Sequence, residues 1–468
     1  MKQELITTFD LFYSSFIIII LIVLSTSKAK SKRATEPYYK NYTKGLIIKI
    51  FGGVIFCLIY ALYYGGGDTV NYYKGVDSFI DVFLDSPYNY FKALFTEDGP
   101  FSRNLFIKVN NFPPPYMIKD TRTYTVIKLS SFFALFGFGG FLATTIIISY
   151  FIYQWVWKLY GFMYQRYPHL ERAINWSVLY IPSTIFWGSG IMKDTFTFGA
   201  TCFAVFGLHQ FFIEKKRMLS TLLQLIIAFY LIITIKAYII FALLPGLLIF
   251  ANFERLKRIE SNFVKIIVIP LSLIAVFFLV QTLFFDFNEM FGKYSADNIL
   301  EEAAIQNSDL QRSVYGSNSF DIGAFEPTIQ GALSKFLPAV NAALFRPYIW
   351  EVGSPTMLFS ALENIILMLL FGWMMLTKPI KFYKEIIQDP FITFCLLFTI
   401  ILGFGVGLST ANFGALVRYK IPFLPFITFL ILSKLSYFIG STKNEKDDVP
   451  KVNLKETNEE DKELKIIT

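Results

Sequence analysis

The sequence predicts an all-α protein, a polytopic membrane helix bundle with about eleven transmembrane helices. Three observations predict this class: 54% of the 468 residues are hydrophobic, 17% are charged, and the mean hydropathy is +0.49. Soluble domains carry about a quarter charged residues and fewer aromatic ones. Phe alone occupies 53 positions, which suits surfaces that face lipid or the membrane interface.

The expected spans are runs of about 20 apolar residues, the length that crosses a bilayer. Lys2 and Glu4 precede the first run and Lys28 and Arg33 follow it, without a small-residue cleavage site between them. This order favours an uncleaved anchor over a signal peptide. The expected spans cover residues 11–27, 45–65, 139–160, 173–191, 195–213, 218–235, 237–253, 264–285, 355–376, 390–408 and 421–438.

The short basic loops predict the orientation of the chain. With eleven spans, nearly all of these loops fall on one side, which predicts an outer N-terminus and a cytoplasmic C-terminus. The net charge of +8 then indicates anionic lipid headgroups as partners and not nucleic acid. Residues 1–440 form the transmembrane domain in this prediction, and the mixed charges of 441–468 predict a disordered cytoplasmic tail.

The sequence offers few parts for metal or histidine chemistry. Its three cysteines all fall within apolar spans, and its two histidines are isolated. Neither a disulfide framework nor a metal motif follows from this spacing. A histidine triad or a zinc site would need more such residues.

Two large outer loops are expected, at about 66–138 and 286–354, each with interfacial helices. In the first, Gly65–Gly67 precede Asp68 at the membrane interface, where Asp68 is either a functional carboxylate or a simple helix stop. Apolar residues at helical spacing over 76–84 predict an amphipathic helix on the bilayer. We interpret its aspartates, Asp77, Asp81 and Asp85, as a solvated face, and Pro113–Pro115 as a spacer between two helices.

A hairpin between two expected spans carries adjacent opposite charges. It reads Ile-Pro-Ser-Thr-Ile-Phe-Trp-Gly-Ser-Gly-Ile-Met-Lys-Asp-Thr over 181–195, and Lys193 and Asp194 are the only charges between Arg172 and Glu214. Ionisable residues at membrane depth often mark function. The alternative is that Lys193 and Asp194 neutralise each other as a structural pair.

Further charges fall on the expected outer face. Arg346 suits phosphate or carboxylate recognition, and Glu351 is either a base or the partner of Arg346 in a structural clamp. Trp350 can stack on a sugar or anchor at the headgroups. Three cations lie at the outer ends of expected spans: Lys236, Arg418 and Lys420. This position opposes the usual bias of basic residues toward the inner side and suggests an anionic ligand. The alternative for each lysine alone is that it snorkels to the interface.

Three of these segments carry a family resemblance. The Pro-Ser-x-x-Phe-Trp-x-Ser-Gly-x-x-Lys-Asp hairpin, the Gly-Gly-Asp-Thr segment and the Arg-Tyr-Lys-x-Pro entry to the last span resemble large-loop bacterial envelope glycosyltransferases. This group includes the GT-C superfamily and the O-antigen and exopolysaccharide repeat-unit polymerases, and the likeness covers about residues 60–430. It implies a polyprenyl-phosphate-linked sugar donor and glycosyl transfer at the outer face of the bacterial inner membrane.

The resemblance implies roles for the singled-out residues. GT-C enzymes place an acidic residue in the first outer loop, which Asp68 matches first and Asp77 second, but this chain lacks a paired acidic motif there. Repeat-unit polymerases use arginines in outer loops, which Arg346 and Arg418 fit. The base would then be Asp68, with Asp194 and Glu351 as substitutes. Trp187 and Trp350 would stack on the sugar. The phosphate-binding residues would be Arg346, Arg418, Lys193, Lys236 and Lys420.

Two other classes remain open at this point. A transporter or flippase for the same lipid-linked sugar would show repeated halves or broken helices near the midplane, and we find no internal repeat in the sequence. A non-catalytic subunit of an envelope assembly complex would use its outer loops for docking. We expect no cofactor for sugar transfer; a divalent metal is neither required nor excluded.

Overall fold

The computed structural model describes residues 5–96, 99–215, 217–256, 271, 299–311, 318–377 and 388–439. Within these ranges the chain is helical and contains no β-strand, so the all-α class is confirmed. The helices of the first part are α1 (Thr8–Lys32), α2 (Tyr42–Leu58), α3 (Asp68–Asp85), α4 (Pro87–Phe95), α5 (Gly99–Val109), α6 (Pro115–Lys119), α7 (Thr121–Phe136) and α8 (Phe141–Arg166).

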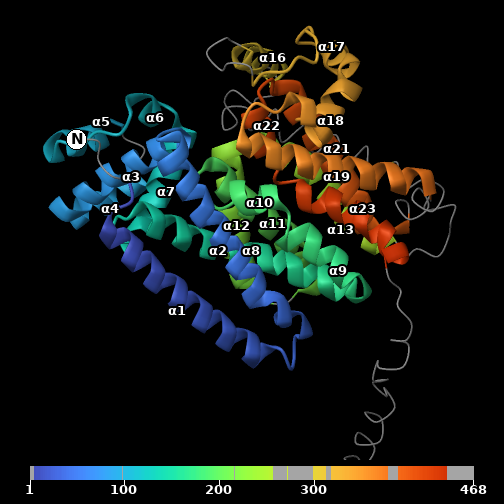
Figure 1. Ribbon diagram of the computed structural model, residues 1–468, viewed down its shortest axis with the longest axis horizontal. Coiled ribbons are helices and arrows are strands. Elements are labelled where there is room, and N and C mark those ends of the chain that lie inside the picture. The colour runs from blue at the N-terminus through green and yellow to red at the C-terminus, as the bar shows by residue number, and fades with distance from the viewer. Residues whose placement is uncertain are drawn as a thin grey trace, which may run out of the picture.

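The second part of the chain continues with helices of very different lengths (Figure 1). They are α9 (Glu171–Ile174), α10 (Pro182–Trp187), α11 (Lys193–His209), α12 (Met218–Lys236), α13 (Tyr238–Leu256), α16 (Ile299–Leu310), α17 (Ile329–Ser334), α18 (Phe336–Phe345), α19 (Pro355–Thr377), α21 (Pro390–Ser409), α22 (Phe413–Tyr419) and α23 (Leu424–Ile439). Short π-helical segments extend α2 over Ile59–Tyr64 and follow α9 over Asn175–Leu179.

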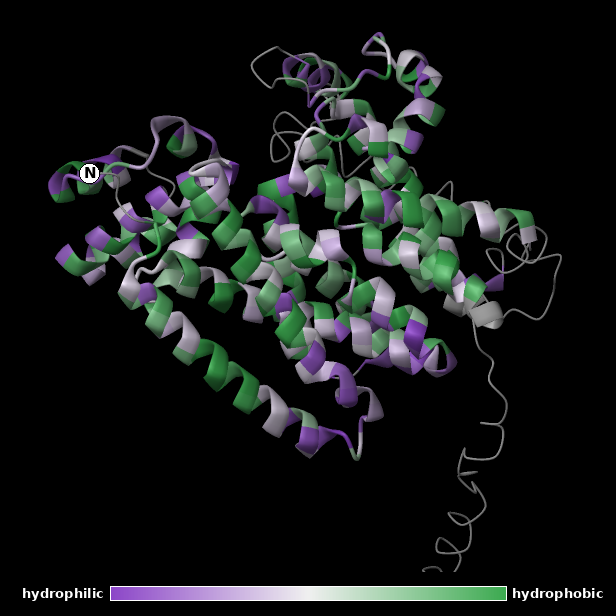
Figure 2. Cartoon of the chain, viewed as in Figure 1, coloured by the Kyte–Doolittle hydropathy of each residue, from purple (hydrophilic) through white to green (hydrophobic). Residues whose placement is uncertain are grey.

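Several helices are suited to a membrane. Within the described residues, 6 helices are long and apolar enough to cross one, or up to 8 if each of two bent pairs is one span. The bent pairs are α7 with α8, at 103°, and α22 with α23, at 70°. The chain therefore has the helices that a membrane protein needs, but the expected number of about eleven spans is not confirmed. Figure 2 shows green, apolar helices through the body of the molecule and purple residues toward its extremities.

One expected span has a different structure. Residues 173–191 were expected to form a single span, but they are divided among the end of α9, a π-helical segment and the short α10. Proline at the first position of α10 explains the break, because proline has no N–H to donate within a continuing helix. The expected span 264–285 lies outside the described residues except for residue 271, and the expected tail 441–468 lies outside them entirely.

Asp10 explains how α1 lies against α8. Its carboxylate accepts hydrogen bonds from the backbone N–H groups of Leu142 (2.9 Å) and Ala143 (3.0 Å), at the start of α8. The first N–H groups of a helix have no partner within the helix, so a carboxylate there stabilises it. Since Asp10 lies near the start of α1, the two helices begin at the same end of the bundle.

The first expected outer loop is a compact helical unit. The apolar face of α3 packs on protein: Phe79 is fully buried and contacts the rings of Phe106 and Tyr124, from α5 and α7. This corrects the expectation that α3 lies on the bilayer with this face. Asn111 donates hydrogen bonds to Asp77 (3.0 Å) and Asp81 (2.7 Å).

The aspartates of α3 thus attach it to its neighbours and do not form a purely solvated face. Asp85, the third of them, pairs with Lys108 of α5 at 2.6 Å. Burial and the nearby Asp81 raise the pKa of Asp77, and the hydrogen bond from Asn111 lowers it less than these raise it. Pro113 and Pro114 lie between α5 and α6, and Pro115 is the first residue of α6, so the proline segment separates two helices as predicted.

Candidate functional site

The structure brings Asp68 and Arg418 together across the whole length of the chain. The Arg418 guanidinium donates a hydrogen bond to the Asp68 carboxylate at 2.7 Å, over a separation of 350 residues. The Asp68 side chain is 56% exposed, whereas that of Arg418 is only 18% exposed. A mostly buried guanidinium therefore meets an accessible carboxylate at this point.

Glycines place Asp68 at the start of α3. Gly65 and Gly67 have φ values of 59° and 105°, which other residues rarely adopt. A Cβ at Gly67 would also lie 2.9 Å from the ring of Tyr60. The chain therefore turns sharply after α2 and presents Asp68 in the first turn of α3.

Arg418 is positioned by the bend between α22 and α23. The side chain of Asn412 caps α22 by accepting a hydrogen bond from the N–H of Ala415 at 3.2 Å. Arg418 lies in the last turn of this short helix and donates through Nε to the carbonyl of Gly414 at 2.9 Å. Its guanidinium is also within electrostatic range of Asp194.

The hairpin charges do not pair with each other. Lys193 forms an ion pair with Asp120, between α6 and α7, at 2.7 Å. Asp194 pairs with Lys236 at the end of α12, and both of these side chains are buried. The interpretation of Lys193 and Asp194 as a mutually neutralising pair is therefore wrong.

These ion pairs lie close to one another and form what we call the charge cluster. Arg418 and Lys193 both interact electrostatically with Lys236, and Lys193 interacts with Asp68. The helices α11 and α12 pack together, and the Asp194–Lys236 pair joins the start of α11 to the end of α12, so the two run antiparallel. The charge cluster consists of Asp68, Asp120, Lys193, Asp194, Lys236 and Arg418.

The two carboxylates of the charge cluster outside the spans are held ionised. Burial raises the pKa of Asp68, but the charge and hydrogen bond of Arg418 outweigh this effect, so its pKa lies below the ordinary value. Burial likewise opposes ionisation of Asp120, yet the adjacent Lys193 lowers its pKa to about 2. At neutral pH both carboxylates are anions that balance nearby cations.

The hairpin segment Pro182–Trp187 forms α10, whose two ends contact charged residues of other helices. The backbone N–H of Ser183 donates to Glu363 of α19 at 2.8 Å. At the other end, Lys49 of α2 donates to the carbonyls of Thr184 (3.1 Å) and Gly188. Figure 1 shows α10 near the centre of the molecule, between α2 and α19.

Lys420 lies outside the charge cluster, beside Asn364 and Glu363 of α19. It is fully buried, donates to the side chain of Asn364, and is within electrostatic range of Glu363. Asn364 in turn donates to the carbonyl of Pro347 at 3.2 Å. Lys420 therefore joins the last helices to α19 and is not free to bind substrate.

The second expected outer loop contains the clamp that the sequence left as one alternative. Arg346 pairs with Glu351 at 2.8 Å and lies over the ring of Phe320. Glu351 also accepts from the backbone N–H of Tyr348 at 2.9 Å. Both side chains are thus engaged within the loop, of which residues 286–298 and 312–317 lie outside the described part.

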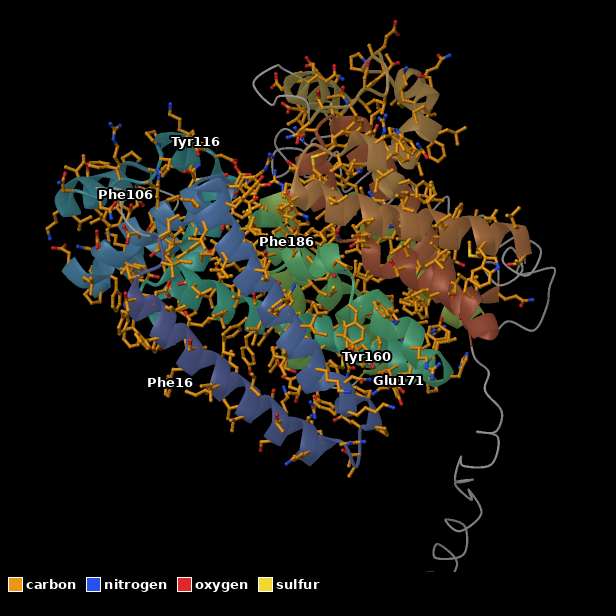
Figure 3. All side chains as sticks on the ribbon, viewed as in Figure 1. Phe16, Phe106, Tyr116, Tyr160, Glu171 and Phe186 are labelled. Carbon is orange, nitrogen blue, oxygen red and sulfur yellow. The ribbon has the colours of Figure 1, made fainter. Side chains whose placement is uncertain are left out.

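The two tryptophans considered for sugar stacking differ in exposure. Trp350 is 75% exposed and stacks on Tyr348 with ring centroids 4.9 Å apart. Trp187 is 6% exposed and packs edge-on against Phe186 and Phe56 in the interior. Trp187 is therefore a core residue, contrary to the expected stacking role. Figure 3 labels the neighbouring Phe186, which lies among the central helices.

Sequence reasoning missed several of these partners. Lys49 and Glu363 each fall inside an apolar span, and an isolated charge there was a usable signal. Asp120 lies in a polar loop and gave no such signal. Within the described residues, no group of three or more His, Cys, Asp or Glu side chains is arranged to hold a metal ion.

Comparisons of the chain with protein-family models, with curated proteins and with solved structures gave no match. The resemblance to envelope glycosyltransferases thus stays a prediction from short motifs.

Proposed function

We propose that the protein is an integral membrane glycosyltransferase or polysaccharide repeat-unit polymerase. It would use a polyprenyl-phosphate-linked sugar donor at the extracytoplasmic face of the bacterial inner membrane. The observation that carries the proposal is the pairing of Asp68 with Arg418, in which an accessible carboxylate covers a mostly buried guanidinium. Both residues belong to segments on which the family resemblance rests.

The chemistry of sugar transfer requires the groups that meet here. The leaving phosphate or diphosphate needs a cation, and the acceptor hydroxyl needs a base close to the reacting carbon. Arginine stays charged and offers a planar fork to phosphate oxygens. Lys193, within electrostatic range of Asp68, adds positive charge beside it.

In our proposal the donor phosphate competes with Asp68 for Arg418. Once the phosphate takes over the guanidinium, Asp68 loses its cation and gains a negatively charged neighbour, so its pKa rises. Asp68 can then accept the proton of the acceptor hydroxyl. As the new bond from the acceptor oxygen to the sugar carbon forms, the bond from that carbon to the phosphate oxygen breaks, and the phosphate leaves with the electron pair beside Arg418.

The remaining residues receive supporting roles. The Asp194–Lys236 and Asp120–Lys193 pairs fix the ends of α11 and α12 around the site. We assign Arg346 and Glu351 to holding the second outer loop, because they bind each other. Trp350, exposed on that loop, is the better candidate for stacking on a sugar ring.

The test compares glycolipid or polymer production in cells that carry Arg418→Ala, Asp68→Asn or the control Arg103→Ala. Arg103 is an exposed arginine of α5 in the same loop as Asp68. With equal membrane abundance, we expect the first two variants to lose product and the control to keep it. Product retained by both Arg418→Ala and Asp68→Asn would refute the proposal.

One observation favours a second candidate, a transporter or flippase for the same lipid-linked sugar. The α10 segment is a short, interrupted helix with charged partners at both ends, and Lys49 lies near the middle of the span Pro37–Tyr64. Discontinuous helices at the midplane are typical of transporters. If the chain is the transferase, cells with Arg418→Ala accumulate the lipid-linked sugar on the outer face, where an impermeant lectin reaches it; a flippase defect would leave it inside.

A further inference from the structure

Three cations lie together at the end of the bundle that is opposite to the charge cluster. Lys158 of α8 is within electrostatic range of Lys28 of α1 and of Arg217, which precedes α12. Lys28 donates to the hydroxyl of Tyr42 (3.0 Å) and to Gln154 (3.1 Å). Lys158 donates to Gln224 of α12 at 3.0 Å. We call Lys28, Lys158 and Arg217 the basic cluster.

The basic cluster has no counter-charge. Among the residues that the structure describes, no carboxylate lies within 4.0 Å of any of its three charged groups. The side chains to which the two lysines donate, those of Tyr42, Gln154 and Gln224, are neutral. In the charge cluster, by contrast, each of Lys193, Lys236 and Arg418 has its own aspartate. Like charges close together and partly removed from water repel each other, so an anion is needed to offset them.

The depth of the basic cluster matches lipid phosphate. The helices α1 and α8 run parallel, since Asp10 near the start of α1 caps the start of α8. Lys28 precedes the end of α1 at Lys32, and Lys158 precedes the end of α8 at Arg166. At a rise of about 1.5 Å per residue, these lysines lie roughly 6 and 12 Å inside the helix ends, within reach of the headgroup region.

Apolar side chains continue from the basic cluster toward the middle of the bundle. Leu24, Phe151 and Ile227 are 57%, 49% and 50% exposed, respectively. Leu24 lies four residues before Lys28, Phe151 lies seven before Lys158, and Ile227 lies three after Gln224. Each of these spacings places the apolar residue on the same helix face as its polar neighbour. The basic cluster thus adjoins exposed apolar surface on three helices, which a free phosphate ion would not use.

We propose that the phosphate of an anionic membrane lipid binds at Lys28, Lys158 and Arg217, with its acyl chains along α1, α8 and α12. Phosphodiester oxygens accept charge-assisted hydrogen bonds from lysine and arginine. Basic groups between transmembrane helices at the headgroup level are suited to such lipids. The site is independent of the proposed glycosyl transfer, because it lies at the other end of the bundle.

The experiment measures lipid retention by the full chain in nanodiscs of phosphatidylcholine with or without phosphatidylglycerol. Native mass spectrometry counts the phosphatidylglycerol that stays bound after transfer to detergent, and thermal unfolding reports stabilisation by that lipid. The variants are Lys28→Gln, Lys158→Gln and Arg217→Gln. The control is Lys30→Gln, an exposed lysine two residues from Lys28 on the other side of α1.

We expect each variant of the basic cluster to bind phosphatidylglycerol about fivefold more weakly, the change that corresponds to about 1 kcal/mol per basic residue. The control should stay within about twofold of the wild type, since its charge is not part of the site. Each comparison is made between two lipid mixtures on the same variant, so a general loss of stability cancels. Arg217→Gln is the safest variant for folding because Arg217 is exposed.

Two results would overturn the proposal. In the first, all three variants retain phosphatidylglycerol as the wild type does. In the second, inorganic phosphate added to phosphatidylcholine nanodiscs stabilises the wild type as much as phosphatidylglycerol, which would identify a free-anion site. Neither result bears on glycosyl transfer, which is read by product formation.

Discussion

Substitution of Lys236 by Met should destabilise the protein strongly, because it leaves a buried carboxylate without its cation. The side chains of Lys236 and Asp194 are only 6% and 4% exposed. Methionine preserves most of the lysine volume but leaves the Asp194 carboxylate buried without a cation. Removing one partner of a buried ion pair costs about 3–5 kcal/mol of the free energy of unfolding.

Two related variants should each lose less free energy of unfolding than Lys236→Met. Asp68→Asn removes a carboxylate that is 56% exposed, and exposed pairs contribute about 0–1 kcal/mol. The double variant Asp194→Asn with Lys236→Met removes both buried charges, so most of the loss should be recovered. We expect the double variant to lose less than about 2 kcal/mol, below the loss from Lys236→Met alone.

The assay is denaturant unfolding in detergent micelles. It is followed for the wild type, the single variants Lys236→Met and Asp194→Asn, their double variant, and Asp68→Asn. A double-mutant cycle then gives the coupling free energy between Asp194 and Lys236. The reasoning is refuted if Lys236→Met costs less than about 1 kcal/mol, or if the losses of the two single variants simply add in the double variant.

Two further stability predictions concern the surroundings of the site. The pKa of Asp120 is about 2 in the folded protein and about 3.9 when unfolded, so its pair with Lys193 stabilises the fold above about pH 4, and this stabilisation is lost as pH falls toward about 2. Unfolding measured from pH 5 to 2 should lack this acid-dependent component in Asp120→Asn. A pH profile identical to that of the wild type would contradict the assignment. Lys49→Met should lower the free energy of unfolding by about 2–4 kcal/mol, because two buried carbonyls at α10 lose their donor. A loss below about 1 kcal/mol, measured by the same denaturant unfolding, would contradict this, because the carbonyls would then have found other partners.

Apolar run length predicted the position of several helices closely. The span expected over 355–376 is α19, which covers Pro355–Thr377, and that expected over 390–408 is α21, which covers Pro390–Ser409. Such runs are local, so the sequence displays them directly. The break at α10 was less evident, although Pro182 within an apolar run was a usable signal.

The pairing of charges could not be predicted in the same way. Lys193 and Asp194 stood out because they interrupt an apolar region, but their partners lie 73 and 42 residues away. Arg418 and Asp68 are separated by 350 residues. Only the packing of the helices decides which opposite charges meet, and the burial of Trp187 depends on the same packing.

The far end of the bundle illustrates the same limit. Asn41 donates to Tyr160 and to Glu171, both at 2.8 Å, although the three residues come from separate segments. Figure 3 labels Tyr160 and Glu171 near each other and far from Tyr116 and Phe106. Neither hydrogen bond had a signature in the sequence.

The most direct test of the proposed mechanism is the affinity of the purified protein for polyprenyl phosphate in nanodiscs, compared between the wild type and Asp68→Asn. If the phosphate competes with Asp68 for Arg418, removing the carboxylate's charge should strengthen binding by about three- to tenfold, as expected for the loss of a competing ion pair worth about 1 kcal/mol, while glycosyl transfer is lost. Arg418→Ala should abolish the binding. Equal or weaker binding by Asp68→Asn would contradict competition at Arg418.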